Sequence, residues 1–265
     1  MHACSNTVNR SCPGGILLAI ILLLLLPCIG LGAPPPLPPA AATLLDAARP
    51  RLNQELANKN LQLGVPVFIR IFKLEGTLEV WMRRDNYFVL FKTYPICSYS
   101  GFPGPKIREG DWQSPEGFYT VSAKQMHPGS RYHLAFNIGY PNEFDRYRKR
   151  TGSAIMVHGG CSSRGCFAMG DRNMEEIYLL AHSALAEGQK QFDVHIFPFK
   201  LSQKNMHKFR SSPWFGFWKT LQPGYMAFCA THQVPQISTI NGRYVINAPG
   251  ARVALIPAHH ASVLP

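Results

Sequence analysis

The segment from Ile155 to Asp171 gathers residue types that could do chemistry. It places His158, Cys161 and Cys166 within nine residues, among glycines and serines. A thiol reacts as its thiolate, so a nucleophilic cysteine needs a nearby base and a polar surrounding. His158 ends an apolar run that predicts a strand, which would hold its imidazole rigidly, and Cys166 follows Gly165 on a flexible turn. The pattern predicts a cysteine nucleophile with a histidine base.

Two other chemistries use the same residue types. His158, Cys161 and Cys166 are close to the spacing of zinc ligands, and His133 could supply a fourth ligand. Alternatively, Cys161 and Cys166 could form a disulfide that closes a very short loop. The nucleophile is preferred, because no second cysteine pair lies nearby and an oxidising compartment disfavours a bare thiolate cluster. We therefore expect no metal and no cofactor.

Other side chains near this segment are candidate substrate contacts. Ser163 and Arg164 precede the thiol, and Arg164 adds positive charge beside it. The amide of Gly165 could donate to a developing oxyanion. His133 and Asn137 fall on one face of a strand expected at residues 131–140, so His133 could bind substrate. A satisfied structural histidine is an equal alternative.

The first residues indicate a compartment. Residues 1–32 contain one arginine, no acidic residue and the apolar run GILLAIILLLLL, which is typical of a secretory signal. An uncleaved anchor is the alternative, because the run approaches membrane-spanning length. We expect the rest of the chain outside the cytoplasm, and the predicted location is the periplasm or cell envelope. The formal net charge of +12 suits a polyanionic partner, which could be nucleic acid, an anionic lipid or an acidic cell-wall polymer. Without an arginine-rich run or a helix-turn-helix pattern, nucleic acid is not the expected partner.

Four cysteines follow the expected signal, and an oxidising compartment would by default pair them. If Cys166 stays a thiol, an odd number remains. One possibility is a reversible disulfide between Cys161 and Cys166 that switches the nucleophile off. The preferred alternatives are a pair of Cys97 with Cys229, or four reduced cysteines.

The elements predict a mostly β protein with inserted helices, an α+β class. Residues 33–60 read as an extended Pro/Ala-rich linker to residue 42 and a short helix over 43–60. Residues 61–247 form the expected catalytic domain and 248–265 a tail. Strands are predicted at 65–72, 78–84, 87–96, 118–123, 131–140, 153–157 and 192–200. Helices are predicted at 171–188, capped by Asp171, and at 213–222. A hairpin is predicted at 236–248. Asp111 and Glu116, in the Gly/Pro loop 100–117, are expected to be solvated.

The residues around Cys166 resemble a known active-site signature. Ser163-x-Gly165-Cys166 with His158-Gly159 upstream resembles the L,D-transpeptidase (YkuD-type) catalytic domains. Over roughly residues 60–247 the chain is similar to the YafK-like branch of that family. The segments that carry this similarity are CSYSGFPGPKIREGDWQSPEGFYTV, RYHLAFNIGYPNEFDR, GSAIMVHGGCSSRGCFAMGD and NGRYV.

This resemblance implies a catalytic β-sandwich that acts on peptidoglycan stem peptides. It implies that Cys166 attacks the carbonyl of the third-position diamino acid to form an acyl-enzyme. His158 is the implied base, the carbonyl of Gly159 orients it, and the amides of Gly165 and Cys166 are the implied oxyanion donors. The YafK-like branch is associated with detaching envelope lipoprotein from peptidoglycan, which is a hydrolysis.

Two departures from the family pattern affect the expected outcome. Seven residues separate His158 from Cys166, where many members carry a longer loop that belongs to the acceptor region. Hydrolysis is therefore favoured over transpeptidation, which would form crosslinks or attach lipoprotein. Ala168 stands where members often carry an arginine, so Arg131 or Arg164 would have to hold a substrate carboxylate. A non-catalytic or metal-binding envelope module is a further alternative.

Overall fold

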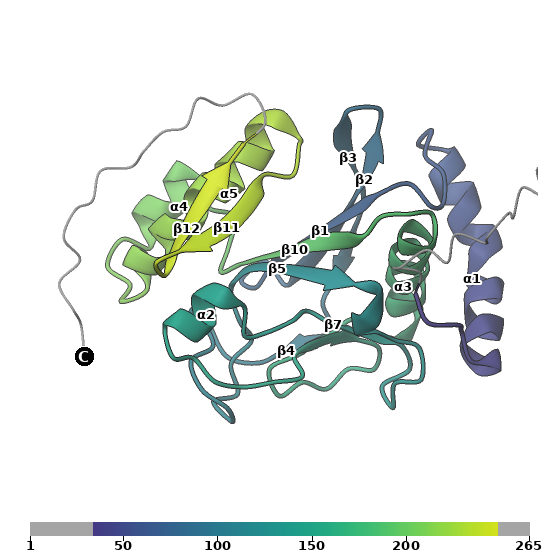
Figure 1. The fold of residues 1–265 in the computed structure, drawn as a ribbon, viewed down its shortest axis with the longest axis horizontal. Coiled ribbons are helices and arrows are strands. Elements are labelled where there is room, and N and C mark those ends of the chain that lie inside the picture. Colours follow the sequence, from purple (N-terminus) through teal and green to yellow (C-terminus); the bar gives the residue numbers. More distant parts are fainter. Residues whose placement is uncertain (1–33, 249–265) are drawn as a thin grey trace, which may run out of the picture. The chain divides into compact units, whose positions relative to one another are not determined.

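The computed structural model describes residues 34–248, so the predicted signal over 1–32 and nearly all of the predicted tail lie outside the described residues. Two five-stranded sheets carry the fold (Figure 1). The first has the order β3-β2-β1-β10-β5. Its strands are β1 (Val67–Phe72), β2 (Thr77–Arg84), β3 (Tyr87–Pro95), β5 (Gly117–Ser122) and β10 (Gln191–Phe197).

The second sheet has the order β4-β9-β8-β7-β6 and is built from much shorter strands. They are β4 (Ser98–Tyr99), β6 (Met126–His127), β7 (Ala135–Asn137), β8 (Met156–His158) and β9 (Phe167–Ala168). The strand predicted over 131–140 is reduced to β7, because His133 adopts a left-handed backbone conformation with a φ of 70° that ends regular pairing.

Helices and a hairpin complete the α+β class, which is confirmed. The helical segments are α1 (Pro39–Ala57), η1 (Ala123–Gln125), α2 (Glu143–Tyr147), α3 (Asp171–Ala186), α4 (Gln203–Lys208) and α5 (Phe215–Thr231). The hairpin pairs β11 (Gln236–Ile240) with β12 (Arg243–Asn247). Among these helices of residues 34–248, none is both long and apolar enough to cross a membrane.

The two sheets share one apolar core, as expected for a sandwich. Alternate residues of β10, such as Val194, and of β1, such as Ile69 and Ile71, belong to the same buried cluster as Phe136 and Val157 of the second sheet. Burying such side chains stabilises the fold by roughly 1.5–3 kcal/mol each. This core fixes the second sheet, which carries the residues around Cys166.

Helix α1 begins earlier than the sequence suggests. Its first residue, Pro39, suits a helix start because proline has a fixed φ and needs no amide partner there. The expectation of an extended linker up to residue 42 is therefore wrong from Pro39 onward. Leu45 and Leu52 are fully buried in the shared core, and Arg51 lies 2.7 Å from Glu176 of α3. The helix is part of the packed unit.

A second apolar cluster lies between the first sheet, α5 and the hairpin. Trp218 and Leu221 of α5 pack with Phe197 of β10, and Tyr244 of β12 lies against this cluster. Helix α5 continues past Pro223, beyond the predicted end at residue 222, because this packing stabilises the further helical turns. Figure 1 shows α4, α5, β11 and β12 gathered together.

Candidate active site

Strands β8 and β9 bring His158 and Cys166 to one face of the second sheet. The strands are parallel, with His158 opposite Ala168. Cys166, two residues before Ala168, therefore lies beside Met156, two residues before His158. The Met156 N–H donates to Cys166 Sγ over 3.4 Å. Side chains alternate along a strand, so Met156, His158 and Cys166 point to the same side.

His158 is held by the turn that follows it. Its side chain is 3% exposed, and its Nδ1 lies 2.5 Å from the carbonyl oxygen of Gly159. That contact requires Nδ1 to donate, which leaves Nε2 free to accept a proton. Asp171 does not cap α3, whose N-cap is Gly170; its carboxylate accepts from the Gly160 N–H over 2.7 Å. The carboxylate thus fixes the turn that orients His158.

Gly159 is a packing requirement of this turn. A Cβ on Gly159 would lie 2.7 Å from Asp171 Oδ1 and 2.9 Å from the carbonyl oxygen of Tyr132. Distances this short force neighbouring atoms to move. Any larger residue here would displace the carbonyl that holds His158.

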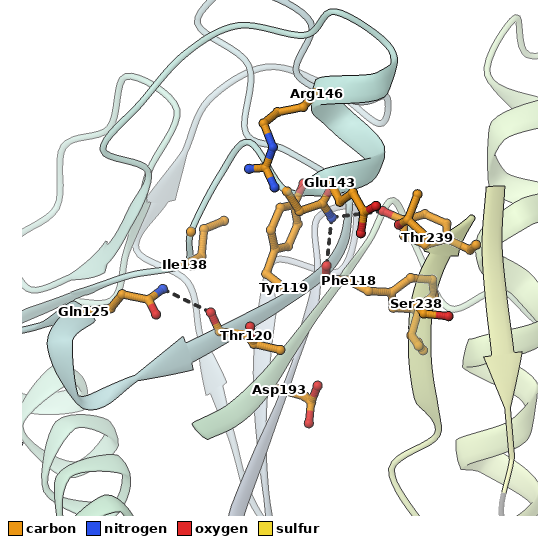
Figure 2. A pocket seen from close by; sticks show the side chains of 14 residues that line it. Phe118, Tyr119, Thr120, Gln125, Ile138, Glu143, Arg146, Asp193, Ser238 and Thr239 are labelled. Atoms are coloured by element: carbon orange, nitrogen blue, oxygen red, sulfur yellow. Dashed lines mark hydrogen bonds between the residues drawn. The ribbon is translucent and has the colours of Figure 1, made fainter. Parts of the chain in front are cut away.

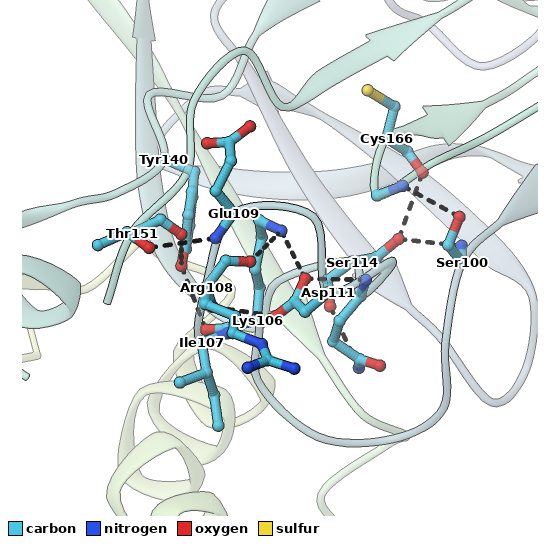
Figure 3. Close-up of polar contacts among 12 residues, drawn as sticks. Ser100, Lys106, Ile107, Arg108, Glu109, Asp111, Ser114, Tyr140, Thr151 and Cys166 are labelled. Atoms are coloured by element: carbon cyan, nitrogen blue, oxygen red, sulfur yellow. Dashed lines mark hydrogen bonds and ion pairs between the residues drawn. The ribbon is translucent and has the colours of Figure 1, made fainter. Parts of the chain in front are cut away.

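Three serines fix the backbone around Cys166, and Figure 3 shows two of them, Ser100 and Ser114. Ser163 Oγ donates to the Cys166 carbonyl over 2.7 Å, and Ser114 Oγ reaches the same carbonyl over 3.3 Å. The Gly165 N–H donates to Ser100 Oγ over 3.0 Å and to Ser163 Oγ over 3.1 Å. Sequence reasoning identified Ser163 through its motif but missed Ser100 and Ser114, which carry no local signal.

A buried ion pair anchors the loop that carries Ser114. Lys73 Nζ lies 3.0 Å from Glu116 Oε1 and donates to the carbonyl of Ser114 over 2.9 Å. Trp218 Nε1 donates to Glu116 Oε2 over 2.8 Å. Lys73 and Glu116 are fully buried, so the expectation that Glu116 is solvated is wrong.

Asp111 is also engaged within the same loop. It accepts from Lys106 Nζ over 2.5 Å and from the N–H groups of Ile107, Arg108 and Gln113 (Figure 3). The expectation of a solvated carboxylate is wrong here too, because Lys106 is buried beside it. The loop is a rigid support for the Cys166 turn.

A cleft of about 560 Å³ lies in front of His158 and Cys166. Such a volume is typical of sites for small ligands. Residues 126–132 and Ala135 form much of its wall, with Pro35, Ala154 and Met156 completing it. The ring of Tyr132 lies 4.9 Å from that of His158. Arg131 is exposed at this cleft and pairs with no carboxylate within residues 34–248.

Burial sets the charge state of the pair. It raises the pKa of the Cys166 thiol, while the Met156 N–H and the charge of Lys106 act in the opposite direction. Burial also lowers the pKa of His158, against the opposing bond to Gly159. At neutral pH the resting pair is therefore a thiol and a neutral imidazole. A nucleophilic attack by Cys166 would then require transfer of the thiol proton to a base, and Nε2 of His158 is available as an acceptor.

The alkylation rate of Cys166 should follow this charge state. Because its pKa is raised, we expect the rate with iodoacetamide to keep rising with pH beyond about 8.5, the value of an ordinary thiol. Rates are measured across the pH range by mass spectrometry of the Cys166 peptide, with exposed Cys229 as the internal comparison. A plateau below pH 7 would instead indicate a preformed thiolate–imidazolium pair.

Comparison with known proteins decides the family. The model of the L,D-transpeptidase catalytic domain matches residues 66–188. The chain is 40% identical over 230 residues to "Putative L,D-transpeptidase YafK" of Escherichia coli K12, covering 87% of this chain and 89% of the relative. The chain belongs to the L,D-transpeptidase family. The same identity and coverage hold for the protein of that name in Escherichia coli O157:H7.

More distant similarities exist among solved structures. The helical cell shape determining protein Pgp2 of Campylobacter jejuni gives a TM-score of 0.42 at 17% identity, covering 76% of this chain and 80% of that one. A mutant form of Pgp2 gives a TM-score of 0.43 at 23% identity, covering 72% and 66%.

Two predicted contacts of this L,D-transpeptidase-family protein are not part of the cleft. His133 Nε2 lies 2.8 Å from Glu175 Oε1 of α3, and Asn137 Oδ1 accepts from the Gly139 N–H over 2.8 Å. Neither residue lines the space around Cys166. Both side chains therefore have partners outside the cleft, and for His133, whose backbone is left-handed, the contact with Glu175 matches the alternative of a satisfied structural histidine.

Three other predicted substrate contacts are Arg131, Arg164 and the Gly165 amide, and of these only Arg131 lines the cleft. The guanidinium of Arg164 lies 5.2 Å over the ring of Trp112, so Arg131 is the candidate cation that lines the cleft. The Gly165 N–H is already engaged by two hydroxyls. Of the two amides predicted to stabilise an oxyanion, the Cys166 amide is therefore the better candidate.

The cysteine pairing differs from every predicted pair. Cys161 forms a disulfide with Cys97, with Cα atoms 5.3 Å apart, and Cys166 and Cys229 are free. The predicted pairs Cys161–Cys166 and Cys97–Cys229 are both wrong. The disulfide also removes the Cys161 sulfur from the zinc-ligand alternative. Within residues 34–248, no three His, Cys, Asp or Glu side chains are grouped to hold a metal.

The disulfide should contribute to stability more than to reactivity. It closes a sequence separation of 64 residues, and loops of this size typically stabilise by about 2–4 kcal/mol. We expect Cys161→Ser to lower the free energy of unfolding by that amount in denaturant titrations. Cys166 should remain open to alkylation in the folded variant. Adding reductant to the wild type is the matched control, and unchanged stability in both would contradict the pairing.

Proposed function

We propose that this protein is a cysteine-dependent peptidoglycan enzyme that acts at the carbonyl of the third-position diamino acid of stem peptides. The observation that supports this most is the placement of Cys166 and His158 on one face of parallel strands, lining one cleft. Membership of the L,D-transpeptidase family supplies the substrate class. Without that membership the same geometry would fit several thiol-dependent acyl transfers.

In the proposed acylation step, Cys166 Sγ attacks the carbonyl carbon of the scissile amide. The thiol proton passes to His158 Nε2, because Nδ1 is occupied by the carbonyl of Gly159. The carbonyl oxygen gains negative charge, which the Cys166 amide would stabilise. The C–N bond then breaks, the departing amine takes the proton from His158, and a thioester remains on Cys166.

The thioester is released by water in the favoured outcome. His158 accepts a proton from the water, whose oxygen attacks the thioester carbonyl. The C–S bond then breaks, and the Cys166 sulfur takes that proton back from His158. The stem peptide is released with a new carboxyl group. The short segment between His158 and Cys166, tied at Cys161 to Cys97, leaves little chain to build an acceptor site. The amide cut in this way would include the one that links envelope lipoprotein to peptidoglycan.

Arg131 is proposed to hold a carboxylate of the stem peptide. It lines the cleft and no acidic side chain within residues 34–248 neutralises it. Hydrogen bonds to charged groups contribute about 1.5–3 kcal/mol, so Arg131→Ala should raise KM at least about tenfold with a smaller change in kcat. Arg164→Ala, which removes the cation on Trp112, is the matched control. Equal effects of both variants would remove Arg131 from this role.

The decisive experiment for the function is intact-mass analysis of the full chain with defined muropeptides. Tetrapeptide-containing and lipoprotein-linked muropeptides are incubated separately with the protein. An adduct of stem-peptide mass that maps to Cys166 supports the acyl-enzyme. Freed stem peptides then indicate hydrolysis, and new bridges between third-position residues indicate transpeptidation. No adduct and no product from either substrate would reject the proposal in favour of a non-catalytic envelope module.

Location and domain limits complete the proposal. The substrate lies in the cell envelope, which fits export by the signal predicted over residues 1–32. The catalytic unit is proposed to span residues 61–247, with α1 packed against it. Cell fractionation followed by N-terminal sequencing of the mature protein tests both the export and the removal of the signal.

A further inference from the structure

A second cavity lies away from the Cys166 cleft and shares no lining residue with it. Its volume is about 440 Å³, within the range of small-ligand sites. Strands β5 and β10, helix α2 and strands β11 and β12 supply its walls (Figure 2). Neither the family resemblance nor the proposed reaction uses it.

Asp193 of β10 is the unusual feature of this cavity. Its side chain is partly buried, and burial raises its pKa to about 6. No side chain within residues 34–248 forms an ion pair or hydrogen bond with its carboxylate, and burial is the one cause of the shift. A charged group withdrawn from water without a partner is destabilising. The cavity therefore contains negative charge that the described chain leaves uncompensated.

The surroundings of Asp193 suit one kind of cation. Thr120 lies opposite Asp193 in the β5–β10 pair, and Ser238 and Thr239 line the cavity from β11. These hydroxyls can accept hydrogen bonds alongside the carboxylate. A primary ammonium has three donors and no acceptor, so it matches a cavity that combines a carboxylate with several hydroxyls. The one arginine in the lining, Arg146, donates to the carbonyl of Pro141 and lies at the opposite end from Asp193 (Figure 2).

We propose that this cavity binds the primary ammonium group of a peptide side chain, with Asp193 as its counter-ion. The site would hold a lysine-like or diamino-acid side chain of a peptide while leaving the Cys166 cleft open. It does not depend on the proposed reaction, since binding alone is claimed.

The test uses the full chain and a pair of blocked amino acids. N-acetyl-lysine methylamide carries a side-chain ammonium, and N-acetyl-norleucine methylamide has a similar apolar chain without it. We expect the lysine probe to bind at least about tenfold more tightly by calorimetry or NMR titration, which corresponds to one charge-assisted hydrogen bond. Asp193→Asn should abolish this preference. Asp85→Asn, at an exposed turn between β2 and β3, should leave it unchanged.

The outcomes separate clearly. Equal binding of the two probes, no binding of either at millimolar concentration, or an unchanged preference in Asp193→Asn each overturns the proposal. Folding of the variant is checked by thermal melting. Because none of these readouts is turnover, failure of this proposal and failure of the proposed reaction are distinguishable.

Titration of Asp193 gives a second readout. Other charged or titratable groups that line or adjoin the cavity are Glu143, Arg146, Tyr119, Tyr244 and His195. The carbon-13 signal of the Asp193 carboxyl should titrate near pH 6 in the free protein and at a lower pH with the lysine probe.

The stability of the Asp193→Asn variant gives a further check. Because the pKa of Asp193 is raised in the folded state, this group favours the folded state below its unfolded pKa and loses that contribution as pH rises through about 6. Asp193→Asn should therefore melt higher than wild type at pH 7.5 and equally at pH 3.5. A free-protein pKa near the ordinary value would show that the carboxylate is solvated or already paired, and would overturn the proposal.

Discussion

Replacing Cys166 by alanine should lower turnover of muropeptides at least about a thousandfold, because the sulfur is the proposed attacking atom. The variant should remain folded. The Cys166 backbone is held through its carbonyl by Ser163 and Ser114, and alanine retains that carbonyl. Turnover is measured by chromatography of the released peptides, and folding by circular dichroism and thermal melting.

The second free thiol provides the matched control. Cys229 lies on α5, 3.7 Å from the guanidinium of Arg70 and outside the cleft. Cys229→Ala should keep full activity and the same stem-peptide adduct by intact mass. Full activity in Cys166→Ala, or equal losses in both variants, would contradict the assignment of the nucleophile.

Replacing His158 by alanine should reduce turnover by about 100- to 10,000-fold, the usual contribution of a general base. Burial keeps the pKa of the Cys166 thiol raised, so without a proton acceptor the thiol is a poor nucleophile at neutral pH. Alkylation of Cys166 with iodoacetamide at pH 7 should slow in parallel. At pH 10 the rates of variant and wild type should converge, because hydroxide then removes the proton.

His133 is the matched control for this variant. Its Nε2 is paired with Glu175 Oε1 over 2.8 Å and it does not line the cleft. His133→Ala should leave the alkylation rate of Cys166 unchanged, with a modest loss of stability. If labelling is lost in His133→Ala but not in His158→Ala, the base is His133, and the assignment of His158 is wrong.

The sequence by itself indicated the chemistry and the class of fold. His158, Gly159, Ser163 and Cys166 lie within nine residues, and strands that flank a glycine-rich turn place such neighbours together by local geometry alone. The long strands and α3 could also be predicted, because their apolar residues repeat with periods that depend only on nearby positions. The resemblance to the family was likewise visible in the sequence, in the motif around Cys166 and in segments spread over residues 60–247.

Only the tertiary structure decided the contacts between distant segments. The partner of Cys161 is 64 residues away, and Ser100 and Ser114 reach the Cys166 turn from another loop. No local pattern encodes which distant residue a side chain meets.

The same reason explains why the predicted surroundings of two polar residues, Glu116 and His133, differ from those in the structure. Glu116 sits in a loop that reads as solvated, yet it is fully buried because Lys73 and Trp218 satisfy its oxygens. His133 lies on a segment that reads as a strand, but its left-handed φ turns the ring to Glu175. Burial and partner choice depend on the packing of the whole chain. The residues that support the site were therefore found only in the fold, whereas the proposed reactive pair, His158 and Cys166, could be predicted from the sequence.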